Sequence, residues 1–200
     1  MIINRLAKGI YLLIAAIIGL LIIVKSTDYI TPDFNSGFLV DKQSQFFIYK
    51  YFLYAHIIGA PIALFAGAFQ ILRPYSIYHG KGGKLYFYTV VFLAAPGGFY
   101  MAFYAIGGMW SIISFLLLST LWFVFTIQGL LKVRNGQIQL HKSFMTRSFI
   151  LANSAILIRL LIFFNHKLDI MPPVEAYVWI SWLSWLPALI IYEVSLLRQN

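Results

Sequence analysis

Cysteine is absent from this chain of 200 residues, and charged side chains make up only 10% of it. Without cysteine there is no disulfide framework, no thiolate metal site and no cysteine nucleophile. Soluble domains carry about 25% charged residues, so a sizeable soluble domain is excluded. The HExxH zinc motif, the glycine-rich nucleotide loops and the GxSxG elbow are also missing. The sequence therefore leaves open whether the protein is an enzyme.

Long apolar runs take up most of the chain, which is 61% hydrophobic. About 20 apolar residues cross the roughly 30 Å of bilayer hydrocarbon. We predict an all-α polytopic membrane protein in which residues 1–200 form a single transmembrane domain. The first apolar run follows a basic start but lacks a small-x-small cleavage site, so we expect it to be a retained helix. The six predicted spans are about 7–24, 51–72, 85–106, 111–131, 146–165 and 177–196.

The basic side chains gather on one side of these spans, which predicts the orientation. With the N-terminus inside, the outer face carries only Lys25, Lys42, Lys50 and Lys167. The inner face then carries Arg5, Lys8, Arg73, Lys81, Lys84, Lys132, Arg134, Lys142, Arg147 and Arg198. The positive-inside rule therefore predicts that both termini are cytoplasmic. Topology and contact with anionic lipid headgroups explain the net charge of +9. The expected partner is thus the lipid bilayer, and nucleic acid is not needed.

Two spans contain residues that weaken a helix. Pro61 lies in the second span, and the run Pro96-Gly97-Gly98 lies near the middle of the third. Both weaken backbone hydrogen bonding and favour kinks. We interpret Pro61 as a packing feature. The Pro-Gly-Gly run predicts either a hinge or a place where another group approaches the backbone.

Arg159 lies deep in the apolar run LANSAILIRLLIFF, where a charge is costly and usually functional. The outer half of the predicted membrane region holds no acidic residue to pair with it. His56 lies at similar depth in the second span. Small and polar residues surround both positions at helical spacing, which predicts a polar seam between spans 2 and 5. This seam is either a tight helix contact or a ligand cavity bordered by His56 and Arg159.

A second group of candidates lies at the cytoplasmic edge. His79 and His141 share one depth there, which makes them the candidate pair for a haem b or another metal. Arg147 is a further candidate for ligand binding. We expect Glu193 to form a structural ion pair with Arg147, Arg198 or Lys142. The remaining aromatic residues fit interfacial belts, formed by Tyr75, Tyr78, Tyr86 and Tyr88 inside and by Trp110, Tyr177 and Trp179 outside.

Four segments taken in order resemble a bacterial family of membrane proteins known as domain of unknown function 2306. They are HIIGAPIALFAGAFQ (56–70), HGKGGKLY (79–86), HKSFMTR (141–147) and Arg159. The resemblance covers about residues 50–165. Gly80 stands where the family pattern has its first arginine, which puts an anion-binding role at that position in doubt. The resemblance implies a multi-pass helical protein of a bacterial inner membrane. It implies no established activity, and it points to His56, His79, His141 and Arg159.

Three classes of function stay open. The first is a membrane redox protein that depends on haem or metal, and the second binds or transports a small anionic or amphipathic molecule held by Arg159. The third is an accessory or assembly subunit without catalysis. A metal hydrolase using His79 and His141 would also need a third ligand and a general base, and Glu193 is the nearest acid.

Overall fold

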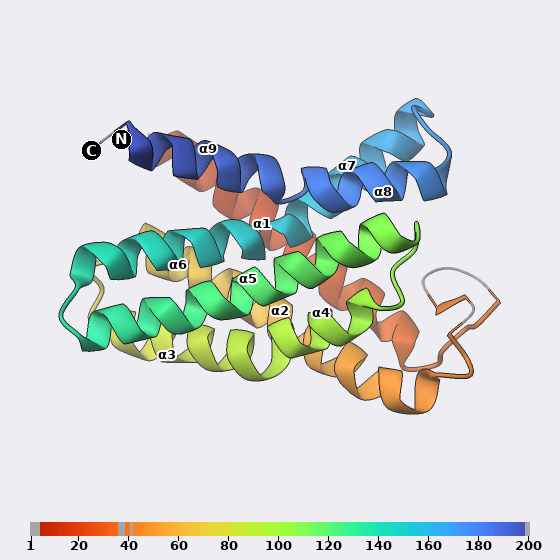
Figure 1. Cartoon of the computed structure of the whole chain (residues 1–200), viewed down its shortest axis with the longest axis horizontal. Coiled ribbons are helices and arrows are strands. Elements are labelled where there is room, and N and C mark those ends of the chain that lie inside the picture. Colours follow the sequence, from red (N-terminus) through yellow and green to blue (C-terminus); the bar gives the residue numbers. More distant parts are fainter. Residues whose placement is uncertain (1–4, 36–38, 41, 199–200) are drawn as a thin grey trace.

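The computed structural model describes residues 5–35, 39–40 and 42–198, and all regular structure in these ranges is helical (Figure 1). Most of the long helices run back and forth along one axis (Figure 1). The elements are α1 (Arg5–Ser26), η1 (Thr27–Tyr29), α2 (Phe46–Leu72), α3 (His79–Thr89), η3 (Val90–Ala94), α4 (Ala95–Ala102), α5 (Met109–Arg134), α6 (Ile138–Ala152), α7 (Ser154–Leu168), α8 (Pro173–Leu183) and α9 (Leu186–Leu197).

Five helical stretches in the described ranges are long and apolar enough to cross a membrane. They are Phe46–Leu72, His79–Ala102, Met109–Arg134, Ile138–Leu168 and Pro173–Leu197. The second, fourth, fifth and sixth predicted spans lie within these stretches, and the third, 85–106, overlaps His79–Ala102 but was predicted four residues too long at its end. The first predicted span falls in α1, a helix of 22 residues that is not among the five. The protein is therefore an all-helical membrane protein with several apolar helices, and the total of six spans stays a prediction.

Interruptions divide three of these stretches. Val90–Ala94 forms a π turn in which the Ala95 N–H bonds to the Val90 carbonyl. The π turn ends just before Pro96, which has no N–H to donate to the preceding turn. Two further interruptions, at Asn153 and at Ser184–Trp185, were not predicted from the sequence. By contrast, α2 continues as an α-helix through Pro61, which is buried.

The close contact between α2 and the α3–α4 stretch depends on glycine. A Cβ atom on Gly59 would lie 2.6 Å from the Leu93 Cβ, and one on Gly97 would lie 2.6 Å from the Phe52 carbonyl oxygen. The backbone that approaches the predicted Pro-Gly-Gly run is therefore that of α2. Of the two interpretations of this run, the structure supports close approach.

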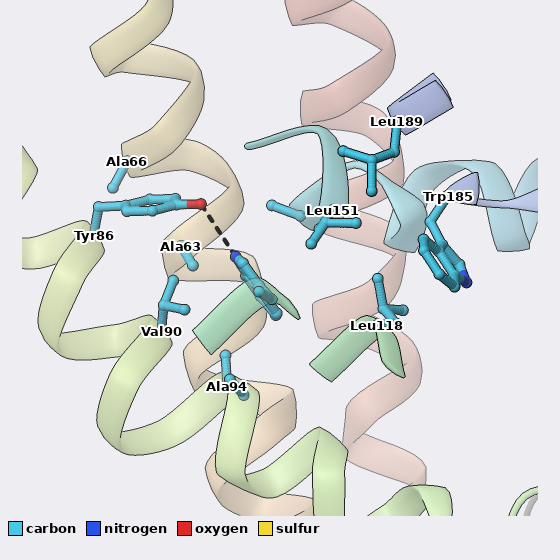
Figure 2. Packing of buried hydrophobic residues seen from close by; sticks show 12 residues of the cluster. Ala63, Ala66, Tyr86, Val90, Ala94, Leu118, Leu151, Trp185 and Leu189 are labelled. Atoms are coloured by element: carbon cyan, nitrogen blue, oxygen red, sulfur yellow. Dashed lines mark hydrogen bonds between the residues drawn. The ribbon is translucent and has the colours of Figure 1, made fainter. Parts of the chain in front are cut away.

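The core lies where α2, α3, α5, α6 and the α8–α9 junction meet, as Figure 2 shows. A chain of hydrogen bonds crosses it: the Trp122 indole donates to the Tyr86 hydroxyl (3.1 Å), which lies 2.6 Å from the Ser148 hydroxyl. The Thr126 hydroxyl lies 2.7 Å from Ser148 and donates to the Trp122 carbonyl. Tyr86 is 0% exposed, so its assignment to the interfacial belt was wrong. A buried phenol needs a partner, and Ser148 and Trp122 supply two.

Candidate functional site

Arg147 and Glu193 form an ion pair between α6 and α9. The Arg147 Nε donates to Glu193 Oε1 at 2.6 Å, and Nη2 donates to Oε2 at 2.8 Å. The remaining Nη1 donates to the Ser143 hydroxyl at 2.6 Å. The guanidinium also lies within 6 Å of three aromatic ring centroids, those of Phe125, Phe144 and Tyr192. The predicted structural pair is thus present, and the guanidinium that was a ligand candidate is engaged by the protein itself.

Arg159 lies on α7 and has far fewer partners. Its Nη1 donates to the Ala155 carbonyl, one turn back on the same helix, at 2.8 Å. No acidic side chain in the described ranges forms a salt bridge with it. The residue is exposed on α7. Within the part of the chain that the structure describes, the other four of the five N–H donors of this guanidinium have no hydrogen-bond partner.

Two tyrosines lie within electrostatic range of Arg159. Tyr29 comes from η1, after the end of α1, and Tyr177 comes from α8. Burial raises the pKa of the Tyr29 phenol, and the positive charge of Arg159 acts in the opposite direction. A raised pKa keeps this phenol neutral near pH 7, so its O–H stays a donor. Sequence reasoning assigned Tyr177 to a belt and did not single out Tyr29, because no helical spacing links either one to Arg159.

His56 lies on α2, opposite the π turn. Its Nδ1 lies 2.7 Å from the Ala94 carbonyl oxygen. A carbonyl only accepts, so Nδ1 carries the proton and a neutral His56 has its lone pair on Nε2. No described residue hydrogen-bonds to Nε2. The charge of Arg159 also acts on His56, although α2 and α7, which carry the two residues, make no close backbone approach in the described elements.

The predicted seam between spans 2 and 5 differs along its length. α2 packs against α6, where a Cβ on Gly67 would lie 2.5 Å from the Phe149 ring. Among the described elements, α2 makes no such close backbone approach to α7, which carries Arg159. Ile18 and Ile22 of α1 instead pack with Leu64 of α2 and Ile156 of α7. The tight-contact interpretation therefore describes the α2–α6 part, and Arg159 lies beyond it.

His79 and His141, the candidate metal pair, interact with one another electrostatically. His141 donates from Nδ1 to the Gly129 carbonyl at 2.8 Å. The described ranges contain no group of three or more histidine, aspartate or glutamate side chains that fits a metal ion. The donor set therefore does not support the haem or metal interpretation of His79 and His141.

Gln70 of α2 packs against α3, the helix that begins at His79. Gln70 is 7% exposed, and neither atom of its amide has a partner in the described residues. A Cβ on Gly82 would collide with the Gln70 Nε2, so the amide packs on the glycine-rich first turns of α3. The sequence signal was present: a glutamine at the end of an apolar span, opposite the run HGKGGK.

Apolar helices that cross back and forth, with an arginine and histidines between them, define a multi-pass helical membrane protein. The chain belongs to the family described as predicted membrane protein (DUF2306), whose sequence model matches residues 53–196. The four segments on which the resemblance rested all lie within this range. No curated protein and no solved structure matches the chain.

Proposed function

We propose that the protein binds a small anionic or amphipathic molecule, with Arg159 as the anchor for its negative group. Tyr29, Tyr177 and His56 lie within electrostatic range of the guanidinium. Such groups match a carboxylate or phosphate carried on an apolar body, because charge-assisted hydrogen bonds hold the head while the surrounding helices accept the tail. A lipid of the surrounding membrane and a dissolved amphiphile both have this chemistry.

One comparison within the chain carries the proposal. Two arginines, Arg147 and Arg159, project from the same helical stretch, Ile138–Leu168. Arg147 has a bidentate carboxylate, a hydroxyl and three rings, whereas Arg159 has one carbonyl of its own helix. An arginine in a membrane helix pairs with other groups or marks a binding path. All three guanidinium nitrogens of Arg147 donate to side chains of the protein. By contrast, the open donors of Arg159 support the binding of a ligand at this residue.

The test uses dansyl-undecanoic acid as the anionic probe and its uncharged amide as the matched control probe. The protein is held in nanodiscs of zwitterionic phosphatidylcholine. We expect the acid to bind more tightly than the amide, and Arg159→Leu to weaken the acid roughly 10-fold or more, because a hydrogen bond to a charged group contributes about 1.5–3 kcal/mol. Arg159→Lys keeps the charge and should retain part of the affinity. Equal binding of the acid to the wild type and to a folded Arg159→Leu protein would refute the proposal.

Placement in the membrane is part of the same proposal. The charge distribution supports six spans in a bacterial inner membrane with both termini in the cytoplasm. In that orientation Arg159, Tyr29 and Tyr177 belong to the outer half of the bilayer. The ligand would then enter from the outer leaflet or from the periplasm.

A further inference from the structure

Three buried polar atoms lie without a hydrogen-bond partner where α3 begins. They are the Nε2 and Oε1 of Gln70 and the Nδ1 of His79, and none of them bonds to a described residue. Gln70 comes from the last turns of α2 and is 7% exposed, and His79 is the first residue of α3. A buried polar atom without a partner is costly, so these three atoms need an explanation such as a bound ion or ligand.

The Gln70 amide points at the backbone of the first turns of α3. A Cβ on Gly82 would collide with its Nε2, and one on Gly83 would lie 3.8 Å from its Oε1. His79 comes three and four residues before these glycines, which places it on the same face of the helix. The amide and the imidazole therefore flank one side of the helix start.

The backbone at this helix start also has open donors. The N–H groups of His79 and Gly82 each bond to a carbonyl of the preceding turn at 2.9 Å. Between them, the N–H groups of Gly80 and Lys81 have no acceptor in the described part of the chain, and no side chain caps the helix. A Cβ on Gly80 would meet nothing within 4 Å, so the space beside it is open. The start of a helix with free N–H groups favours an anion.

Positive charge gathers at this end of the bundle, where α2 and α5 end and α3 and α6 begin (Figure 1). Arg73, Lys81 and Lys84 are exposed here, and none of them forms a salt bridge with a described residue. The segments 70–84 and 131–145 contain no aspartate or glutamate. The local charge therefore calls for an anion that the neighbouring chain segments do not supply.

We propose that the start of α3 binds a phosphate group. Two backbone N–H groups of the first turn, the Gln70 amide and the His79 imidazole are the donors, and the exposed lysines add positive charge. A phosphate has oxygens that point in several directions, which suits donors that come from a helix start and from two side chains. The amide reaches the phosphate when its flexible end turns outward from Gly82. Lipid headgroups and dissolved phosphate compounds both carry this group.

Two probes distinguish these sources by calorimetry on the full chain in maltoside detergent. Inorganic phosphate represents the dissolved group, and dioctanoyl phosphatidic acid represents the lipid headgroup. Dioctanoylglycerol, which lacks only the phosphate, is the matched control probe and should bind far more weakly than the phosphatidic acid. Binding of inorganic phosphate supports a dissolved ligand, whereas binding of phosphatidic acid alone supports a lipid headgroup.

Two variants test the residues of the site, each with its own control. Gln70→Leu should weaken binding of the phosphate probe roughly 10-fold, because it removes a hydrogen bond to a charged group. Gln139→Leu, at an exposed glutamine of α6, should leave binding unchanged. Lys81→Gln should weaken binding about 3-fold, as expected for an exposed charge. Lys167→Gln, at an exposed lysine near the end of α7, is its control.

Three results would overturn the proposal. They are failure of both phosphate probes to bind, binding of dioctanoylglycerol as tightly as of phosphatidic acid, and unchanged binding to a folded Gln70→Leu protein. If Gln70→Leu does not fold, unchanged binding to Lys81→Gln overturns it instead. The site is separate from the anion site at Arg159, so the dansyl acid should still bind to Gln70→Leu, and the two proposals fail separately.

Discussion

The two arginines of the α6–α7 stretch differ in how many protein groups interact with their positive charge. Arg147 has a bidentate carboxylate, and its side chain is only 16% exposed, whereas that of Glu193 is 43% exposed. Because the Glu193 carboxylate is partly exposed, the ion pair contributes less to the stability of the protein. The pair stabilises the protein mainly because it provides the buried guanidinium with a charged hydrogen-bond partner.

Removal of Glu193 should therefore destabilise the bundle. We expect Glu193→Leu to lower the stability by about 1–2 kcal/mol, because the charged Arg147 is left without its carboxylate. The double variant Arg147→Leu/Glu193→Leu should lose less than the sum of the two single changes. Thermal unfolding in mild detergent measures all four proteins of this cycle. Strictly additive losses would mean that the pair contributes nothing.

At the scale of single residues, sequence reasoning found the unusual side chains but not their partners. The depth of Arg159 in an apolar run is visible in the sequence, and so is the matching depth of His56. Tyr29 was missed because it comes to Arg159 from a connection after α1, at no fixed spacing. Tyr86 was misassigned because a tyrosine near a helix end looks the same whether it faces lipid headgroups or a serine in the core.

At the scale of elements, glycine sets how closely α2 and α4 approach. Gly97 should not tolerate a side chain, because the atom in its way is the Phe52 carbonyl oxygen, which belongs to the backbone. We expect Gly97→Ala to destabilise the protein by about 1–3 kcal/mol. Gly80 is the matched control, since a Cβ there meets nothing within 4 Å. Gly80→Ala should be neutral or mildly stabilising.

The comparison is made by heating both variants in detergent and measuring the fraction that stays monodisperse. Similar midpoints for Gly97→Ala and Gly80→Ala would show that α2 and α4 are not held at this distance.

The helices themselves were largely predictable, and their interruptions only in part. Long apolar runs with polar connections locate the membrane stretches, since hydrocarbon thickness fixes their length. Pro96 predicts an irregularity in the third span. Whether that irregularity is a hinge or a place of close contact depends on the neighbouring helix, which the sequence does not identify. The break at Ser184–Trp185 comes just before Pro187, which lies in the first turn of α9 and has no N–H to donate to the preceding turn. The Trp185 indole at this break donates to the Ser114 hydroxyl of α5 at 3.0 Å.

At the scale of the whole molecule, the missing cysteines make the orientation measurable. Single cysteines can be introduced at Asn135, between α5 and α6, and at Asp28, beyond α1, both of which are exposed. In intact cells a membrane-impermeant maleimide should label Asp28→Cys and leave Asn135→Cys unlabelled until the membrane is opened. The opposite pattern would reverse the predicted orientation, and the cysteine-free parent protein reports background labelling.

The π turn between α3 and α4 has a consequence for anyone who engineers this protein. Such a turn holds about one residue more than an α-helical turn, and one residue corresponds to about 100° of rotation around the axis. A helical wheel drawn without a break from His79 to Ala102 therefore assigns α4 to the wrong face. Labels, crosslinks or substitutions meant for one face of α4 should be chosen by counting from Ala95 onward.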